Sequence, residues 1–298
     1  MWLDVVLAVV ALGLLVVGYA SLVERNLYRV RSSELSILPA GSRPIRVLHI
    51  SDIHLAPWQK RKMRWVNSLD SLDPDLVVDT GDNLGHLASV RPAISMLEPL
   101  LKVPGVFVNG SNDYHAPVLR NPFTYLFRPS TRSNGGLIDT ATLMTAMETS
   151  GWLNLNNQSG TMTINGVRIG FLGLDDPHDE LAWYERLPQQ QREVAGEDIV
   201  FGIAHAPYLK VIDEFGAAGA SLIFAGHTHG GQVCLPGGRA IITNCDLPAK
   251  SAKGLSSFEV SGKRVWLNVC AGLGTSIFAP FRLFCPPEVR LITLTAKG

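Results

Sequence analysis

Charged residues and cysteines are scarce in this chain of 298 residues, and neither sign of charge is in surplus. Asp, Glu, Lys and Arg make up 17% of the sequence, and 26 basic residues balance 26 acidic ones. Proteins that bind nucleic acid through its phosphates usually carry a basic surplus, so no nucleic-acid partner is expected. The four cysteines show neither Cys-x-x-Cys pairs nor zinc-type spacing. We expect them to be small buried apolar residues rather than a disulfide framework.

Two common catalytic signatures are also absent. The sequence has no Walker-type phosphate loop and no Gly-x-Ser-x-Gly elbow. Apolar residues, in contrast, make up 46% of the chain. That content is enough for a sizeable core and excludes global disorder. The length fits one large domain or two modest ones.

Much of the apolar content lies at the N-terminus. Residues 5–23 carry no charge, and a helix of that length at about 1.5 Å per residue reaches roughly 28 Å, close to the hydrocarbon thickness of a bilayer. A cleaved signal peptide is the alternative, since Gly18-Tyr19-Ala20 offers small residues at the spacing for cleavage. The first four residues lack the basic region of signal peptides, however. We therefore predict a membrane anchor over residues 1–23, a linker over 24–43 and one domain over 44–298.

The charges that flank this apolar segment predict its orientation. Asp4 precedes it, and Arg25, Arg29 and Arg31 follow it. By the positive-inside rule, the side that carries the arginines faces the cytoplasm. The sequence therefore predicts a single-pass protein of the cell membrane with a cytoplasmic domain.

After the linker, short apolar runs alternate with helical patterns. In the first half we predict strands at 45–50, 76–80 and 106–109 and helices at 63–72, 88–101 and 140–150, the last capped by Asp139. The second half is richer in strands, which we place at 161–165, 167–174, 199–204, 221–225, 257–260, 264–269 and 289–294. Asn165-Gly166 and Ser261-Gly262 are typical of tight hairpins. The pattern predicts an α/β fold in which helices cover mixed sheets.

Carboxylate, amide and imidazole side chains follow five of these strands. They are Asp52 and His54, Asp82, Asn112 and Asp113, His205, and His227 and His229. Ligand sites in α/β sheets lie beyond the carboxyl ends of strands, so we expect these groups to share one site. Carboxylate and imidazole groups gathered in this way cost free energy unless a counter-ion balances their charge. A pair of cations would supply that balance. Nitrogen and oxygen ligands without thiolate suit divalent Mn, Fe or Zn.

Two such ions about 3.5–4 Å apart form a catalytic centre for phosphoryl transfer. They lower the pKa of a bridging water to give a hydroxide nucleophile, and they balance the charge of the phosphoryl oxygens.

The order of these motifs resembles the calcineurin-like metallophosphoesterase superfamily over about residues 45–295. The segments 230–232, 271–276 and 286–289 resemble its membrane-associated bacterial branch, which includes enzymes similar to UDP-2,3-diacylglucosamine pyrophosphatases. The resemblance implies a four-layer αββα sandwich with two mixed β-sheets. It also implies metal ligands: Asp52, His54 and His229 for the first ion, Asp82 for both, and His205, His227 and Asn112 for the second.

The third motif departs from the family pattern. The family has Gly-Asn-His-Asp or Gly-Asn-His-Glu, whereas this chain has Gly110-Ser111-Asn112-Asp113. Either Ser111 takes the ligand position or, with a shift of one residue, Asn112 does; we favour Asn112 because its amide oxygen matches the family's Asn. The usual His is missing in both registers. We predict that Asp113 is a protonated acid or a partner of a ligand His, and that His115 or His86 supplies the missing imidazole.

These features together predict a membrane-anchored, binuclear phosphoesterase that cleaves a phosphodiester or a pyrophosphate, lipid-linked or nucleotide-linked. A weak acid favours substrates whose leaving group needs little protonation, as in diesters and pyrophosphates. A phosphoprotein or phosphomonoester phosphatase and a non-catalytic metal-binding scaffold are the alternatives.

Two smaller sequence signals each have more than one interpretation. The basic run 59–64 fits a phosphate, an anionic headgroup or a solvated helix start, and the segment 175–178 fits support of the site or a simple turn.

Overall fold

Twelve strands form two six-stranded sheets in residues 1–119 and 135–298, the part of the chain that the computed structural model describes. From edge to edge, the first sheet contains β1 (Arg29–Leu38), β12 (Glu288–Ala296), β2 (Ile45–Ile50), β3 (Leu76–Asp79), β4 (Gly105–Phe107) and β5 (Leu153–Asn154). The second contains β10 (Gly254–Val260), β11 (Lys263–Val269), β9 (Leu222–Ala225), β8 (Ile199–Ile203), β7 (Val167–Gly173) and β6 (Ser159–Ile164). Both sheets are mixed: β12 runs antiparallel to β2, and the hairpins β6–β7 and β10–β11 are antiparallel, whereas the other pairs are parallel.

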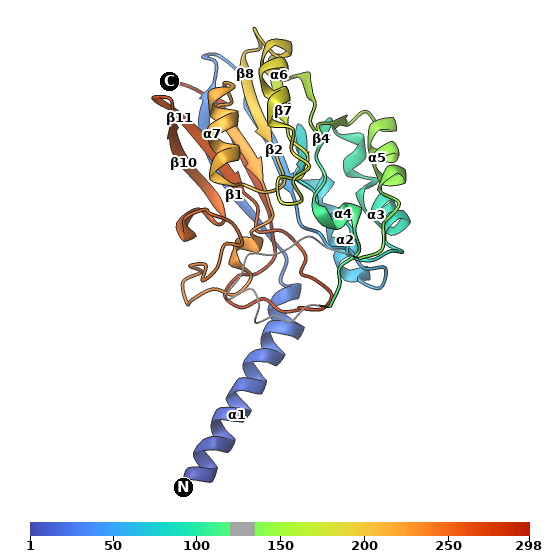
Figure 1. Ribbon diagram of the computed structural model, residues 1–298, viewed down its shortest axis with the longest axis vertical. Helices are drawn as coiled ribbons and strands as arrows, with labels where there is room; N and C mark the ends of the chain where they lie inside the picture. Colours follow the sequence, from blue (N-terminus) through green and yellow to red (C-terminus); the bar gives the residue numbers. More distant parts are fainter. Residues whose placement is uncertain (120–134) are drawn as a thin grey trace.

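Helices cover the outer face of each sheet (Figure 1). The α-helices are α1 (Trp2–Gly18), α2 (Lys60–Asn67), α3 (Val90–Leu97), α4 (Ser111–Tyr114), α5 (Thr140–Thr149), α6 (Leu187–Glu193) and α7 (Leu209–Ala217). Short turns of other helix types are η1 (Tyr19–Val23), η2 (Glu24–Asn26), η3 (Ser68–Leu72), η4 (Leu100–Lys102), η6 (Tyr184–Arg186), η7 (His229–Gly231) and η8 (Ala249–Ser251). In the picture α2, α3 and α5 lie on one side of the sheets, and α6 and α7 lie on the other.

Three apolar clusters hold these layers together. The central cluster joins residues of both sheets, such as Val47 of β2 and Phe224 of β9, so the sheets pack face to face. A second cluster packs α2, α3 and α5 against the first sheet, and a third packs α6 and α7 against the second. Burial of these apolar side chains supplies most of the driving force for folding. The layers are those of the predicted αββα sandwich, and that prediction is confirmed.

Local sequence signals explain several element boundaries. Asn165 and Gly166 both have positive φ, of 51° and 86°, and join β6 to β7 in the predicted two-residue hairpin. Ser261 and Gly262 do the same between β10 and β11. The Asp139 carboxylate accepts a hydrogen bond from the backbone N–H of Thr142, which is the predicted cap of α5.

The interpretation of residues 24–43 as a linker is wrong. Residues 29–38 form β1, which pairs in parallel with β12 along the edge of the first sheet. Leu35, Ile37 and Leu38 are buried in the central core. All five exposed residues of this edge strand are polar, and this polar surface made the segment resemble a connector.

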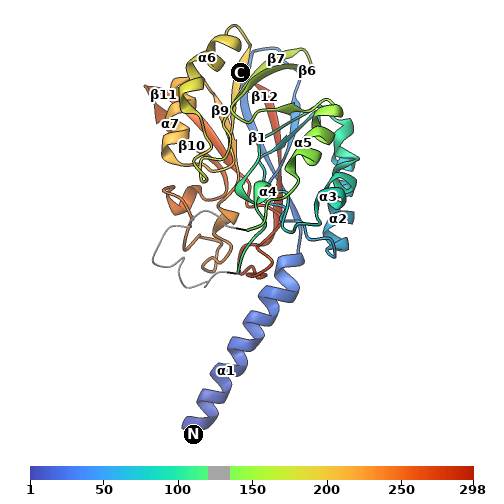
Figure 2. The ribbon, with the colours of Figure 1, turned by 45° about the vertical axis from the view of Figure 1, so that its right-hand side comes forward.

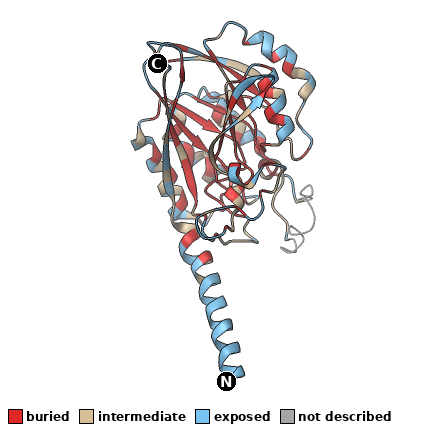
Figure 3. Ribbon diagram, turned by 90° about the vertical axis from the view of Figure 1, so that its left-hand side faces the viewer, coloured by how far each residue is buried: buried red, intermediate tan, exposed pale blue. Residues whose placement is uncertain are grey.

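The N-terminal helix stands apart from the domain. Figures 1 and 2 show α1 projecting from one end, and Figure 3 shows it exposed along its length. With η1 and η2 it forms one helix of 25 residues, Trp2–Asn26, long and apolar enough to cross a membrane by length and composition. Its last turns contact the domain. The backbone N–H of Arg282 donates to the backbone oxygen of Ala20, and that of Cys285 donates to the Glu24 carboxylate at 2.6 Å.

Candidate metal centre

The carboxyl ends of β2, β3, β4, β8 and β9 meet at one place, as the order of the strands predicts. Five side chains from four of these ends converge, and all five are at most partly exposed. They form two overlapping groups whose ligand atoms lie within 4.8 Å of one another, Asp52 with His54 and His229, and Asp52 with Asp82 and His205.

Within this cluster, the nitrogen atoms of the histidines and the carboxylate oxygens of the aspartates point toward one another at short distances. His54 Nε2 lies 3.1 Å from His229 Nε2 and 3.4 Å from Asp82 Oδ2. His205 Nε2 lies 3.5 Å from the same Asp82 oxygen, and His229 Nε2 lies 3.6 Å from Asp52 Oδ1. Asp82 therefore lies between histidines from two different loops, and His229 lies next to both His54 and Asp52.

The backbone at these positions is strained. Asp52, His54, Asp82, His227 and His229 have φ between 42° and 66°, in the left-handed region that residues other than glycine rarely adopt. Such conformations cost about 1–3 kcal/mol each and cluster at functional sites. Five of the seven predicted metal ligands thus hold a conformation that local propensity disfavours and that aims their side chains at the cluster.

Two glycines, Gly81 and Gly226, let the loops of the site approach one another closely. A Cβ on Gly226 would collide with the Ser51 hydroxyl and the Asp52 carboxylate. Gly81 has φ of 86°, and a Cβ there would collide with the backbone of Asn109 and Gly110. A larger residue at either position would push apart the loops that carry the cluster.

The donor set fits a cation. His205 Nδ1 donates to the backbone oxygen of Thr80 at 2.7 Å, which directs Nε2 toward Asp82. No hydrogen-bond partner is present for His205 Nε2 or for His54 Nδ1 among the described residues. Buried polar atoms without partners are rare, and a ligand ion would satisfy His205 Nε2.

Burial and neighbouring charge set the protonation of the cluster. Burial lowers the pKa of His54 to about 4, so this ring is neutral at pH 7, as a metal ligand must be. Burial also lowers the pKa of His229 and of His227 well below the usual value. For His205 burial acts in the same direction, but the Asp82 carboxylate outweighs it and raises the pKa. In the chain alone a proton on His205 balances Asp82, and a cation could take its place.

His227 and Asn112 lie beside the five clustered residues. The His227 ring is edge-on to that of His205, with 5.3 Å between centroids, and its Nε2 donates to the backbone oxygen of Asn244 at 3.3 Å. The Asn112 amide lies 2.8 Å from Asp82 Oδ2, and its backbone N–H donates to Asp82 Oδ1 at the same distance.

Asp113 connects two loops of the site through the backbone. Its carboxylate accepts four backbone N–H bonds of 2.8–3.1 Å, from Asp82, Asn83, Leu84 and Gly110. Each carboxylate oxygen accepts two of them, so donors already face all four of its lone-pair positions. Burial raises the pKa of Asp113 to about 7, and N–H donors, including that of Gly110, oppose the rise.

The two other histidines predicted to act in catalysis lie in different settings. His86 Nδ1 accepts from the backbone N–H of Ala88, and the ring packs edge-on against Trp58. His115 follows α4, and its Nδ1 has no hydrogen-bond partner among the described residues. Among the described interactions neither ring contacts the metal-ligand cluster, so both roles stay predictions.

Three further residues contact the cluster or the loops that carry it, and none of them was among the predicted site residues. Arg282 is fully buried and donates to the backbone oxygens of Ala271, Gly274 and His229. Lys62 donates from its buried ammonium to the backbone oxygen of Ile53 at 2.6 Å. The ring of His178 lies against that of His227, with 4.7 Å between centroids. Of these, His178 and Lys62 belong to sequence signals, the segment 175–178 after a strand and the basic run 59–64, whereas Arg282 belongs to none.

Comparison with known proteins agrees with this geometry. A family model described as calcineurin-like phosphoesterase matches residues 45–231. A protein of Aquifex aeolicus (strain VF5) described as an uncharacterized metallophosphoesterase is 26% identical over 269 residues, which are 89% of this chain and 90% of that protein. A Bos taurus protein described as a transmembrane protein with metallophosphoesterase domain is 26% identical over 210 residues, which are 66% of this chain and 43% of that protein.

Solved structures include similar chains at much lower identity. A crystal structure of a dimetal phosphatase from Danio rerio aligns with a TM-score of 0.44 and 9% identity, over 77% of this chain and 88% of that chain. The family match alone spans well over half of this sequence and covers the ends of β2, β3, β4, β8 and β9 that carry the predicted ligands. The chain therefore belongs to the calcineurin-like phosphoesterase family, and is by that membership a metal-dependent phosphoester hydrolase.

Proposed function

We propose that this chain is a membrane-anchored hydrolase of a phosphodiester or pyrophosphate bond in a lipid-linked or nucleotide-linked molecule. One observation gives the strongest support for a lipid-linked substrate. Arg282 contacts both the end of the N-terminal helix, through its backbone N–H and Ala20, and the cluster residue His229, through its guanidinium. A single residue, Arg282, thus connects the predicted metal centre to the helix through which the chain would leave a bilayer.

The proposed anchor gives such a substrate an advantage. A hydrolase held at the membrane meets lipid-linked phosphates at a higher effective concentration than a free one would. The resemblance of the tail to the membrane-associated bacterial branch supports the same substrate class. The three arginines that follow the apolar segment support a cytoplasmic position of the domain, and Glu24 at the foot of the helix supports a domain that begins near residue 24.

We assign the metal ligands according to the resemblance and the convergence of the side chains. Asp52, His54 and His229 would hold one divalent ion, and His205, His227 and Asn112 the other. Asp82 would contact both. The set contains only nitrogen and oxygen ligands, which supports Mn, Fe or Zn.

When bound, such a pair of ions lowers the pKa of a coordinated water and balances negative charge on the phosphoryl oxygens. The chain's own residues position this chemistry. Asp113 fixes the loop of Asp82 to the loop of Asn112 through backbone N–H groups. Lys62 fixes the loop between Asp52 and His54. The four N–H bonds to Asp113 favour a positioning role over the role of a proton donor. Without a His in the third motif, substrates with good leaving groups are favoured.

The test is hydrolysis of bis-p-nitrophenyl phosphate and of p-nitrophenyl phosphate by the full chain in neutral detergent, with and without Mn²⁺. We expect metal-dependent cleavage that prefers the diester and falls at least about a thousandfold in Asp82→Asn. Asp70→Asn, an exposed carboxylate in η3, is the matched control and should retain the parent rate.

A preference for the monoester would instead support the phosphatase alternative. Two bound ions by elemental analysis without turnover of either substrate, or of a lipid-linked pyrophosphate, would support a metal-binding scaffold and refute the proposal.

A further inference from the structure

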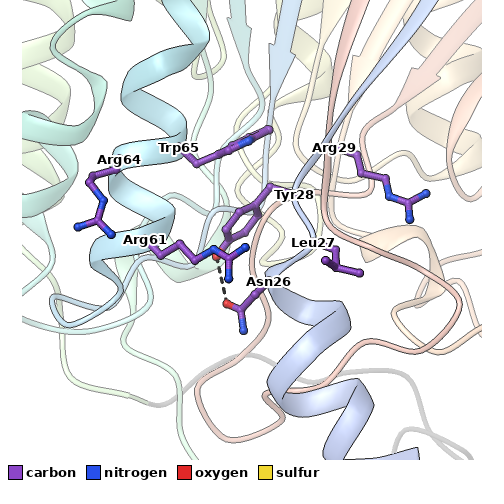
Figure 4. A pocket seen from close by; sticks show the side chains of 7 residues that line it. All are labelled: Asn26, Leu27, Tyr28, Arg29, Arg61, Arg64 and Trp65. Atoms are coloured by element: carbon purple, nitrogen blue, oxygen red, sulfur yellow. Dashed lines mark hydrogen bonds between the residues drawn. The ribbon is translucent and has the colours of Figure 1, made fainter.

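A pocket of about 510 Å³ lies between the end of the N-terminal helix and α2. Figure 4 shows its walls, to which η2, the start of β1, the two residues between them and α2 contribute Asn26, Tyr28, Arg29, Arg61, Arg64 and Trp65. The rings of Tyr28 and Trp65 pack together at 5.3 Å between centroids and form an aromatic wall. Arg61 and Arg64 extend on one side of Tyr28, and Arg29 lies on the other. We call this the arginine pocket.

The positive charge of the arginine pocket is not balanced. Arg29, Arg61 and Arg64 are exposed, and among the described residues none of them has a carboxylate within 4.0 Å. Arg31, two residues along β1, does form such a pair, with Glu288 at 3.6 Å. Burial raises the pKa of Tyr28, and the nearby Arg61 opposes that rise. Three guanidinium groups that line one pocket without a paired carboxylate form a site that favours an anion.

The location of the pocket indicates the source of that anion. The apolar helix runs from Trp2 to Asn26, and at about 1.5 Å per residue it extends roughly 36 Å, somewhat more than the 30 Å hydrocarbon core of a bilayer. Its last turn, closed by a hydrogen bond from the Asn26 amide to the backbone oxygen of Leu22, would then lie among lipid headgroups. Tyr and Trp side chains are enriched at this depth.

We propose that the arginine pocket binds the phosphate of an anionic phospholipid headgroup as a site separate from the metal centre. This inference rests on the proposed membrane anchor. Guanidinium groups bind phosphate oxygens through paired N–H donors, and the aromatic wall faces the glycerol and the first acyl carbons. The buried face of α2 carries Lys62, which holds the loop of Asp52 and His54. A lipid at this site therefore stabilises the helix against which one metal-binding loop rests.

The test uses the full chain in neutral detergent micelles and native mass spectrometry, which counts lipids that stay bound. The probes are phosphatidylglycerol, phosphatidylcholine and the soluble phosphate ester sn-glycerol 3-phosphate. We expect one phosphatidylglycerol per chain, bound at least tenfold more tightly than phosphatidylcholine. Arg61→Gln with Arg64→Gln should lose at least tenfold of that affinity. Arg91→Gln with Arg192→Gln removes the same charge from exposed positions of α3 and α6 and should bind within twofold of the parent.

Equal binding of the two lipids, or an unchanged affinity of the Arg61 and Arg64 variant, would overturn the proposal. So would displacement of the lipid by millimolar sn-glycerol 3-phosphate, because the pocket would then be a site for soluble phosphate. Hydrolysis of bis-p-nitrophenyl phosphate within twofold of the parent shows that the variant is folded. Carbonate washing of membranes tests the anchor separately. A chain that is washed off refutes the anchor, whereas an anchored chain without lipid preference refutes the arginine pocket alone.

Discussion

The guanidinium group of Arg282 donates a hydrogen bond of 3.3 Å to the backbone oxygen of His229, and its Nη2 lies 3.4 Å from Nδ1 of the same histidine. Arg282 has no exposed surface, and the acceptors around it are mainly backbone oxygens. The arginine thus orders the loop that ends in one predicted ligand. Since its own N–H bonds to Ala20, it also ties that loop to the N-terminal helix.

Arg282→Lys should weaken the site without removing a ligand. An ammonium group cannot reach all of these carbonyl oxygens, so at least one buried acceptor loses its partner, at a cost of about 2–3 kcal/mol in the free energy of unfolding. Misplacement of His229 should lower Mn²⁺ affinity about tenfold, in the range found for residues that orient metal ligands. Urea unfolding and calorimetric titration with Mn²⁺ measure the two effects. Arg168→Lys, at an exposed pair with Asp198, is the control, and a parent-like metal affinity in Arg282→Lys would contradict the role given to Arg282.

Asp113→Asn should separate a positioning role from acid catalysis. An amide turns one of the two oxygens into a donor that faces backbone N–H groups, which should cost about 2–4 kcal/mol of stability and lower kcat. The pH profile of kcat should keep its shape. Loss of the alkaline limb of the profile would instead identify Asp113 as the proton donor. Asp139→Asn at the cap of α5 is a matched substitution that should change stability little, because both residues cap helices well.

His49 makes the fold sensitive to acid. Its ring is fully buried in β2, and its Nδ1 accepts from the Asn268 amide at 2.7 Å. Burial lowers its pKa in the folded chain from 6.5 to about 3. The unfolded chain therefore binds the extra proton first, so the stability that the neutral ring contributes is complete above pH 6.5 and is lost as the pH falls toward 3.

Between pH 7.5 and pH 5 the parent should therefore lose about 2 kcal/mol more stability than His49→Gln, as measured by urea unfolding without metal. Both proteins keep the histidines predicted to be metal ligands, so the difference between the two curves isolates His49. Parallel curves would show that His49 does not cause the acid sensitivity.

The position of a truncation should decide whether the domain folds. A chain of residues 19–298 keeps β1 and the hydrogen bond of Glu24, and its melting temperature should stay near that of the full chain. A chain of residues 39–298 lacks β1, including buried Leu35 and Leu38. Each such side chain contributes about 1.5–3 kcal/mol, and the exposed edge of β12 invites aggregation. Thermal melts by circular dichroism and soluble yield measure the contrast. Equal stability of the two chains would mean that β1 is dispensable.

The sequence predicted the elements whose signals are local. The strand at 45–50 matches β2 because four of its six residues are apolar, and the hairpin at Asn165-Gly166 follows from a two-residue turn. The predicted ligands Asp52 and His229 could be placed together because ligand sites of α/β sheets lie beyond the carboxyl ends of strands, and those ends converge from both sheets. What could not be predicted depends on distant partners. Residues 29–38 become a strand only through β12, some 250 residues further along the chain.

The supporting side chains were missed for a similar reason. Arg282 belongs to no motif, and its role exists only because four residues from three segments present backbone oxygens to it. The role of Asp113 also depends on partners outside its own segment, since three of its four N–H donors come from the loop after β3. A pattern of residue types can identify a ligand, but the group that holds it in place depends on which loops meet.

Glu24 and Ala20 join the N-terminal helix to the domain without a flexible segment between them. In a bilayer, a helix attached in this way would set the height of the metal centre above the membrane plane. Phosphate groups at one depth would then be within reach, while those carried far from the surface on long headgroups would not. Selection among lipid-linked substrates would thus be a matter of distance from the bilayer as well as of chemistry at the phosphorus. An enzyme on a loose tether could not make that distinction.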